Sequence, residues 1–269
     1  MHKKFNSEAL IGAYWLIRVQ APVTKLLGPK YTRSRSSIEI DITYRCNLSC
    51  CNCNRSCSQA PSVEQMTVQQ IQMFIKDSVD NGIRWKNIRL LGGEPTLHPD
   101  ILIILQLLQE YIEQFSPDTS IHLVTNGFGK KVADILSKVP QTVKIENSAK
   151  ESSEQFFHPF NVAPNDRIEF KFADYSNGCE QTAKWGIGLT PYGYYPCALA
   201  GGIDRIFGFD LGRKKLPNLK DSMVDQLQVF CKLCGMFRYA NHTWRGKMSH
   251  TWEKAYAEYK KKKPRLSSY

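Results

Sequence analysis

The chain has 269 residues, 42% of them hydrophobic, which is enough for one large domain or for one domain with a small appendage. Lysines and arginines outnumber aspartates and glutamates by 36 to 25, and the net charge of +11 favours anionic partners such as nucleic acid, a phosphorylated metabolite or an acidic peptide. No apolar run approaches membrane-spanning length, and Arg18 interrupts the apolar stretch near the N-terminus, so we expect neither a membrane segment nor a signal peptide.

The chain begins with a predicted amphipathic helix. Apolar residues recur at helical spacing over residues 7–27, and Pro22 is expected to bend or end this helix. A basic loop follows over residues 28–37. Isoleucines at positions 38, 40 and 42 then alternate with Glu39, Asp41 and Thr43, which predicts a strand with one apolar and one polar face.

Helices and strands alternate after this first strand. Helices are predicted between the cap Thr67 and the stop signal Gly82, after Pro99, and over residues 130–139 and 151–157. Strands are predicted over residues 88–91, 120–126, 142–147 and 167–172. This alternation is typical of parallel strands with helical crossovers, so we expect the α/β fold class.

The alternation stops near residue 178. Residues 185–197 contain Pro191-Tyr192-Gly193 between short apolar runs, which predicts a β-hairpin. Short helices are predicted over residues 201–206 and 223–229. The tyrosines of the hairpin are expected to pack within it rather than to line a pocket.

Nine cysteines fall into two groups, and their odd number and their clustering argue against a secreted disulfide framework. The early group is Cys46, Cys50, Cys51, Cys53 and Cys57, and the late group is Cys179, Cys197, Cys231 and Cys234. Clustered cysteines in a chain of this length favour metal ligands in a reducing compartment, so we expect a cytoplasmic protein.

Three early cysteines, Cys46, Cys50 and Cys53, have the spacing C-x3-C-x2-C directly after the first strand. Three thiolates from one loop can hold three irons of a cubane cluster and leave the fourth iron open, unlike a four-cysteine site. Taken alone, the spacing also fits zinc. Cys57 follows closely enough to compete as a ligand, and Cys51 is left as a spare thiol.

A second motif follows the strand over residues 88–91. It is Gly92-Gly93-Glu94-Pro95, and His98 lies shortly after it and is expected to be structural. The two motifs, in this order and each after a strand, resemble those of the radical S-adenosylmethionine (SAM) enzymes. The resemblance implies a partial, open β/α barrel of about five to six strands, followed by a small hairpin-plus-helix module.

The resemblance also implies site residues. The early C-x3-C-x2-C cysteines would bind a [4Fe–4S] cluster with SAM at its open iron, and the Gly92–Pro95 segment would bind the amino group of SAM. Asn126, Asn147 and Ser148, at strand ends, would contact its ribose and carboxylate, although buried turn residues are an equally good interpretation. Family members often carry an aromatic residue where this chain has Asn52, so the adenine must be contacted differently.

The late cysteines resemble the twitch module, the shortened form of the SPASM domain. This implies that Cys179, Cys197, Cys231 and Cys234 bind a second [4Fe–4S] cluster, whose four ligands would leave no open iron and would suit electron transfer. A tetrahedral zinc site has the same ligand count and remains the alternative. The implied segments are an N-terminal helix and basic loop (1–35), a radical SAM partial barrel (36–175), the twitch/SPASM-like module (176–240) and a basic helix or tail (241–269).

The activity implied by the resemblance is reductive cleavage of SAM to methionine and a 5′-deoxyadenosyl radical, which abstracts a substrate hydrogen. The expected outcome is a net oxidation (dehydrogenation) or a crosslink. The expected partners are a small-molecule or peptide substrate and a one-electron reductant such as flavodoxin or ferredoxin. The alternative is a metal-stapled nucleic-acid-binding protein without catalysis, which would use the basic tail with Trp244, Trp252 and Tyr256.

Overall fold

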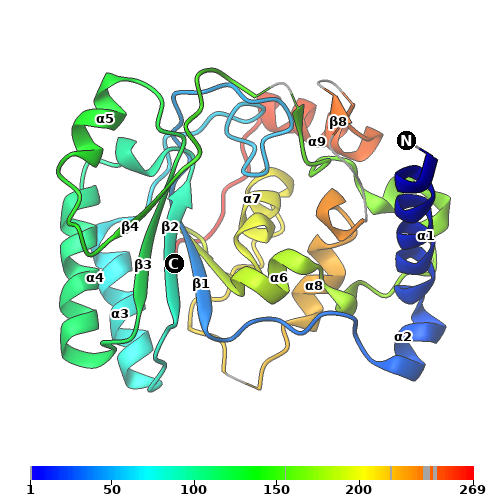
Figure 1. Cartoon of the computed structure of the whole chain (residues 1–269), viewed down its shortest axis with the longest axis horizontal. Coiled ribbons are helices and arrows are strands. Elements are labelled where there is room, and N and C mark those ends of the chain that lie inside the picture. The colour runs from blue at the N-terminus through cyan, green and yellow to red at the C-terminus, as the bar shows by residue number, and fades with distance from the viewer. Residues whose placement is uncertain (1, 155, 219, 239–242, 245–246) are drawn as a thin grey trace.

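A six-stranded sheet forms the centre of the computed structural model, which describes residues 2–154, 156–218, 220–238, 243–244 and 247–269 (Figure 1). Its strands are β4 (Lys144–Asn147), β3 (Ser120–Thr125), β2 (Asn87–Gly92), β1 (Ser37–Thr43), β6 (Ile187–Thr190) and β7 (Gly193–Tyr195), in that spatial order. All neighbours pair in parallel except β6 and β7, which are antiparallel. Among the described residues the sheet ends at β4 and β7 and is open, so the predicted α/β class and partial barrel are confirmed.

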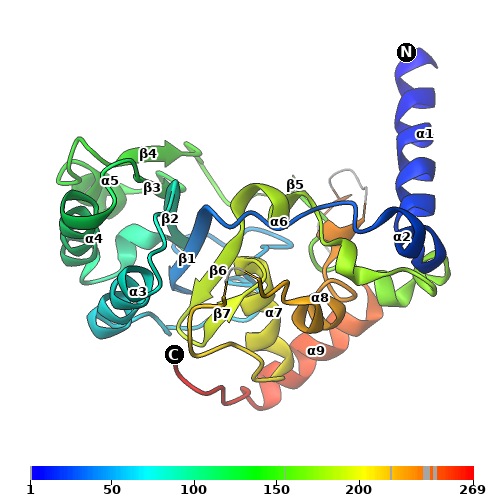
Figure 2. The same ribbon diagram turned by 90° about the horizontal axis from the view of Figure 1, so that it is seen from below.

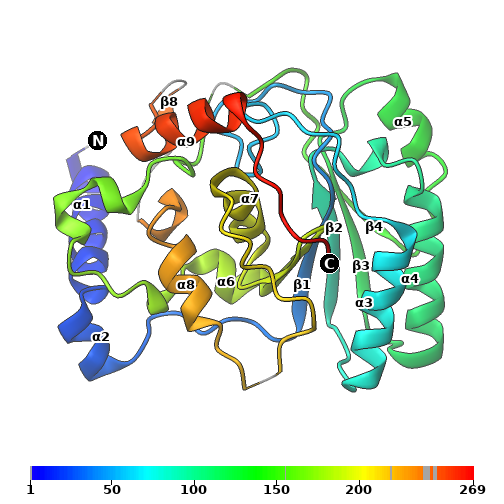
Figure 3. The same cartoon turned by 180° about the vertical axis from the view of Figure 1, so that it is seen from behind.

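Helices lie on both sides of this sheet. One face is covered by α3 (Val68–Asp80), α4 (Ile101–Phe115) and α5 (Lys130–Leu136), as Figure 3 shows from behind. The other side carries α6 (Glu180–Trp185), α7 (Ala198–Phe207), α8 (Val224–Phe230) and α9 (His250–Lys261). The cap predicted at Thr67 is present, and it is a capping box, with the side chains of Thr67 and Gln70 each accepting from the other's backbone N–H.

Strand β1 is buried on both faces, as is usual for a central parallel strand. Its isoleucines pack with Phe74 of α3 and Leu105 of α4 in the main hydrophobic core. Its polar face carries Glu39 and Asp41, which Arg55 pairs at 3.0 Å and 3.2 Å. The alternation seen in the sequence is therefore confirmed, but its polar half is a buried ionic network and not a solvated surface.

The N-terminal helix is two helices. α1 (His2–Arg18) projects from the body of the molecule, and α2 (Ala21–Leu27) follows it (Figure 2). Pro22 lies in the first turn of α2, where its missing N–H costs nothing, so it starts a helix rather than ending one. None of the described helices is long and apolar enough to cross a membrane.

Two predicted elements are wrong. Residues 151–154 are not helical, because their backbone is tied to the cysteine loop: the Cys51 N–H donates to the Glu154 carbonyl at 2.9 Å. The short β5 (Phe156–Phe157) follows and pairs with β8 (Thr243–Trp244). Residues 167–172 are not a strand but include a 3₁₀ turn at Ile168–Phe170, and among the described residues β4 has no further strand beside it.

The predicted hairpin is present as β6 and β7, but it is part of the main sheet. β6 pairs in parallel with β1 from Ile187 to Leu189, so the sheet runs across the boundary expected at residue 176. The basic C-terminal helix is not a solvated appendage either. α9 buries Trp252, Tyr256 and Tyr259 against the body of the protein, and the chain after it returns to the sheet, where Tyr269 is buried in the main core.

Candidate active site

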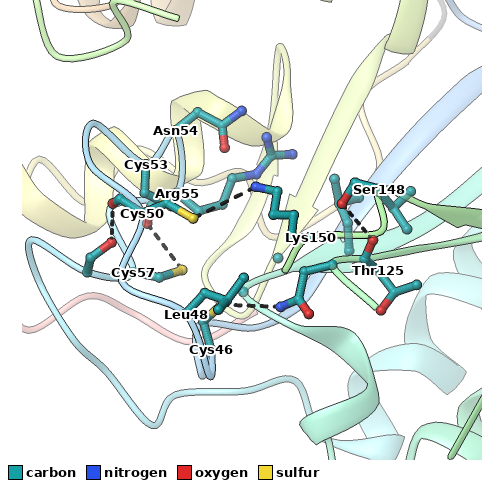
Figure 4. A pocket seen from close by; sticks show the side chains of 16 residues that line it. Cys46, Leu48, Cys50, Cys53, Asn54, Arg55, Cys57, Thr125, Ser148 and Lys150 are labelled. Atoms are coloured by element: carbon teal, nitrogen blue, oxygen red, sulfur yellow. Dashed lines mark hydrogen bonds between the residues drawn. The ribbon is translucent and has the colours of Figure 1, made fainter. Parts of the chain in front are cut away.

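A cavity of about 190 Å³ opens at the carboxyl ends of the parallel strands (Figure 4). It lies between the cysteine loop that follows β1 and the ends of β2, β3 and β4. The lining residues are Cys46, Leu48, Cys50, Cys53, Asn54, Arg55, Cys57, Ser58, Leu91, Gly92, Gly93, Val124, Thr125, Asn126, Ser148 and Lys150. The fold thus brings the three predicted cysteines and the two glycines of the second motif into one cavity, although β2 and the cysteine loop are separated by a whole helix.

Steric contacts explain why both positions of the second motif are glycine. A Cβ atom at Gly92 would lie 2.2 Å from the Thr43 carbonyl oxygen, and one at Gly93 would lie 2.1 Å from the Arg45 carbonyl oxygen. Both distances are far below contact distance, and the obstructing atoms are backbone. The end of β2 therefore packs directly against the chain that leads into Cys46, and this contact fixes the start of the cysteine loop.

Glu94 has a different place from the one the resemblance implied. Its carboxylate is fully buried and does not line the cavity. Oε1 accepts from the hydroxyls of Thr96 and Thr125, both at 2.8 Å, and Oε2 accepts from the Asn126 N–H at 2.8 Å. Glu94 therefore joins the turn after β2 to the end of β3 and orients the residues that follow it.

Only some of the predicted strand-end residues line the cavity. Asn126 and Ser148 line the cavity, whereas Asn147 is exposed outside it, where its Oδ1 accepts from the Ala149 N–H at 2.8 Å. Thr125 also lines the cavity and was not predicted. Pro95 is buried in the 3₁₀ turn after Glu94 and is not a lining residue.

Several N–H groups approach the sulfurs of the cysteine loop. The Glu154 backbone N–H donates to Cys50 Sγ at 3.2 Å, the Lys150 ammonium lies 3.8 Å from the same sulfur, and the Asn126 amide lies 3.9 Å from Cys46 Sγ. Donors of this kind stabilise thiolates and are typical around iron–sulfur clusters. The surroundings of these cysteines therefore fit a thiolate-bound cluster.

Cys57 is close to Cys53 and lines the same cavity. A hydrogen bond with Cys57 is the largest influence on Cys53 and lowers the pKa of its thiol to about 6. The same hydrogen bond, together with burial, raises the pKa of Cys57 well above its usual value. The two shifts have opposite directions and make Cys53 the more acidic thiol of this pair, which agrees with the spacing argument for Cys53 as the ligand.

A cation that the sequence did not single out lies beside the cysteines. Arg55 lines the cavity and is held by the buried carboxylates of β1. Burial raises the pKa of Asp41 to about 6 against the opposing effect of Arg55. Arg55 and Lys150 give this cavity its positive charges. A sequence signal existed for Arg55, because the polar face of β1 needs a cation once it is buried.

The four late cysteines line a second cavity, together with Phe230, Phe237 and other apolar residues. Cys179 and Cys197 are the N-cap residues of α6 and α7, and Cys231 directly follows α8. Burial and, second, the charge of Cys179 raise the pKa of Cys197 to about 12. A cationic metal group would offset this effect, so the ligand chemistry fits such a group, although the cavity between the thiols is only about 10 Å³.

Other candidate residues have structural roles or lie outside the sites. Within the described part of the chain, no three histidine, cysteine, aspartate or glutamate side chains converge closely enough to hold a single metal ion. His98 is buried, and its Nε2 lies 2.8 Å from the Met66 carbonyl oxygen. The hairpin tyrosines are buried and do not line the first cavity, as expected, but their rings pack outside the hairpin, on Tyr44, Tyr269 and Phe230.

Comparison with known proteins agrees with this geometry. A family model described as the radical SAM superfamily matches residues 40–161, which include the second half of β1, the cysteine loop and the strand ends around the first cavity. Residues 40–161 are therefore a radical SAM domain. The matched residues of this radical SAM protein do not include the late cysteines.

Curated relatives resemble only part of this radical SAM protein. It is 31% identical over 105 residues to the GTP 3′,8-cyclase of Campylobacter curvus, a match that covers 38% of this chain and 31% of that protein. It is 34% identical over 102 residues to a probable GTP 3′,8-cyclase of Pyrococcus horikoshii, covering 38% and 30%. The chain thus spans about a third of the length of the curated relatives it matches.

Two solved structures are distantly similar. BtrN in complex with AdoMet and 2-DOIA matches with a TM-score of 0.42 and 15% identity, over 79% of this chain and 94% of that one. SuiB of Streptococcus suis bound to the precursor peptide SuiA matches with a TM-score of 0.30 and 21% identity, over 46% and 26%.

Proposed function

We propose that this radical SAM protein abstracts a hydrogen atom from a small metabolite or peptide and completes a net oxidation or a crosslink. The observation that carries the proposal is the convergence of Cys46, Cys50 and Cys53 with the Gly92-Gly93 turn in one open cavity. A cysteine loop with a purely structural metal site would not need an open cavity at the carboxyl ends of three other strands.

Within this proposal, the three cysteines hold a [4Fe–4S] cluster, and the residues around them hold SAM. When bound, the reduced cluster supplies the electron that cleaves SAM to methionine and a 5′-deoxyadenosyl radical. The Gly92-Gly93 turn presents backbone groups to SAM, and Asn126 and Ser148 contact its polar parts. Glu94 holds Asn126 in place. Leu48, Leu91 and Val124 provide apolar walls that keep water from the reacting atoms.

The late cysteines are proposed to hold a second metal group. Their number and burial support a [4Fe–4S] cluster that accepts an electron from the substrate. A zinc site with the same four ligands is the alternative. A one-electron reductant such as flavodoxin or ferredoxin is the expected partner. The twitch/SPASM-like module proposed for residues 176–240 shares the main sheet through β6.

The test is metal content and SAM cleavage after anaerobic reconstitution. Wild type, a Cys46→Ser/Cys50→Ser/Cys53→Ser variant and a variant with serine at the four late cysteines are compared. The proposal expects about eight irons in wild type and about four in each variant. 5′-Deoxyadenosine should form in wild type and should be absent in the first variant.

Each result has a distinct meaning. Zinc at the late cysteines would remove their electron-transfer role and leave the radical chemistry intact. Absence of both iron and SAM cleavage would overturn the proposal. The nucleic-acid-binding alternative has lost part of its support, because Trp252 and Tyr256 are buried and cannot stack on bases. Trp244 contributes its backbone to β8, and its side chain lies outside the described part of the structure.

A further inference from the structure

A separate polar cavity of about 130 Å³ lies near the amino end of β1, whereas the cysteine loop lies at its carboxyl end. Figure 1 shows the segment between α2 and β1 running along the edge of the molecule beneath α6 and α8. This segment forms one wall of the cavity. The polar lining residues are Thr32, Arg33, Arg35, Ser176, Thr182 and Ser222.

Arg33 is the most unusual of these residues, because only 8% of it is exposed. Its Nη2 donates to the Asp221 carbonyl oxygen at 2.6 Å. Its Nε and Nη1 are also buried, yet neither has a hydrogen-bond partner among the described residues. A buried guanidinium with unpaired N–H groups is costly unless an anion completes its contacts.

The carboxylates nearest in the chain do not supply that anion. The Asp221 carboxylate pairs with Arg213, which also pairs with Asp225 at 2.7 Å. The surroundings of Arg33 are instead positive. Burial is the main cause that lowers the pKa of Arg33 to about 10, and the charges of Arg35 and Arg213 add to it. Arg33 therefore stays charged at neutral pH.

The walls of the cavity are held by backbone hydrogen bonds. The Tyr31 N–H donates to the Asn177 carbonyl at 3.3 Å, and the Ser34 N–H donates to the Thr182 carbonyl at 3.0 Å. These bonds join the segment of Arg33 to the turn that carries Cys179. The Thr182 hydroxyl is occupied, because it donates to the Cys179 carbonyl at 2.7 Å. The hydroxyls of Ser176 and Ser222 line the cavity as well, and an anion would gain hydrogen bonds from them without a rearrangement of the backbone.

We propose that this cavity binds a phosphate-class anion through the unpaired N–H groups of Arg33, with Arg35 and the hydroxyls of Ser176 and Ser222 completing its surroundings. The proposal does not depend on the radical chemistry, because the cavity lies near the opposite end of β1. Arginine suits such a site because its guanidinium stays charged and presents several N–H groups to oxyanions. Both free phosphate and the phosphoryl group of a small molecule have the required chemistry.

The test is calorimetric titration of the full-length protein, reconstituted with its metal groups, with inorganic phosphate against a sodium chloride control of equal ionic strength. Arg33→Met keeps the length and the apolar contacts of the side chain but removes the charge. Arg265→Met is the matched control, since Arg265 is an exposed arginine that does not line this cavity. We expect one phosphate per chain, and an affinity at least about tenfold weaker in Arg33→Met and unchanged in the control.

Thermal unfolding gives a second readout that separates binding from a structural role. Without phosphate, Arg33→Met should unfold at the same or a higher temperature than wild type, because it removes an unpaired buried charge. With phosphate, the unfolding temperature should rise for wild type and the control but not for Arg33→Met. A wild-type protein that shows no phosphate-specific response, or an Arg33→Met variant that responds like wild type, would overturn the proposal.

A phosphate monoester, glycerol phosphate, identifies the source of the anion. If it binds as well as inorganic phosphate, the site accepts the phosphoryl group of a small molecule. If it fails to bind while inorganic phosphate binds, the site takes the free ion.

Discussion

At the scale of single residues, the pairing of Cys53 with Cys57 decides which thiols hold the first cluster. Four early cysteines line the cavity, but the hydrogen bond from Cys57 makes Cys53 the more acidic of this pair. A thiolate and not a thiol binds iron. We therefore predict that Cys53 binds the first cluster and that Cys57 does not.

Serine substitutions test this assignment. Cys53→Ser should lose the first cluster and all SAM cleavage, whereas Cys57→Ser should keep about the same iron content, because a hydroxyl can still donate toward Cys53. Iron content and the spectrum of the reduced cluster measure the difference. Equal loss of iron in both variants would show that Cys57 is itself a ligand.

His98 gives a prediction about pH. Burial lowers the pKa of His98 below the ordinary value of 6.5. Between the pKa of His98 in the folded protein and 6.5, the unfolded chain binds more protons than the folded protein does. The stability contributed by neutral His98 is therefore complete above pH 6.5 and is lost as the pH falls through this window. His98→Gln keeps a hydrogen-bond donor but does not titrate. Denaturant unfolding from pH 7.5 to pH 5 should show wild type losing stability relative to His98→Gln, and parallel curves would contradict the prediction.

At the scale of elements, the contact of β2 with the start of the cysteine loop depends on glycine. Gly93→Ala would place a Cβ 2.1 Å from a backbone oxygen, so the loop must shift. We expect a loss of about 1–3 kcal/mol in the free energy of unfolding, together with reduced iron at the first site. Urea unfolding and metal analysis measure the two effects.

Gly82→Ala is the control for this prediction. Gly82 has a positive φ of 64°, unlike Gly93, and nothing lies within 4 Å of its Cβ position. It should lose about 1 kcal/mol from backbone strain alone and keep its iron. If both variants kept full iron content, the close approach at Gly93 would not be what positions the loop.

The sequence predicted the elements whose evidence is local. The isoleucine alternation of β1, the capping box at Thr67 and the cysteine spacing all depend on neighbouring residues, and the structure bears out the strand and the cap. Residues 167–172 also alternate between polar and apolar side chains, but they form no strand beside β4, because pairing depends on distant contacts and not on the local pattern. Lys150 was missed for the same reason, because its position beside Cys50 depends on a distant contact.

At the scale of the whole molecule, the late part of the chain cannot be a detachable module. β6 and β7 form one side of the sheet, and without them β1 becomes an edge. A protein ending at residue 175 should therefore be insoluble or unfolded, since its edge strand would expose a row of unpaired backbone groups. Substituting the four late cysteines with serine should preserve the fold. Circular dichroism and gel filtration of both proteins test this, and a folded, monomeric 1–175 fragment would contradict it.

Testing the role of the C-terminal basic residues requires substitutions rather than a deletion of the tail. Deleting the chain from Lys260 onward would remove Tyr269, whose hydroxyl contacts that of Tyr194 at 2.9 Å in the core. Lys260→Gln/Lys261→Gln/Lys263→Gln changes charge and leaves that contact. A radical enzyme should retain SAM cleavage in this variant, while a nucleic-acid-binding protein should lose affinity and some salt dependence. Retained cleavage with unchanged weak nucleic-acid binding is the expected result.

The pairing of β1 with β6 has a consequence for the biosynthesis of the protein. Ile38 pairs with Ile187, so about 150 residues are made before the second side of β1 can be covered. At a synthesis rate of about 5–20 residues per second, this edge of the nascent chain stays uncovered for roughly ten to thirty seconds. The strand that leads into the cysteine loop is thus also the strand that most needs protection by chaperones before the chain is complete.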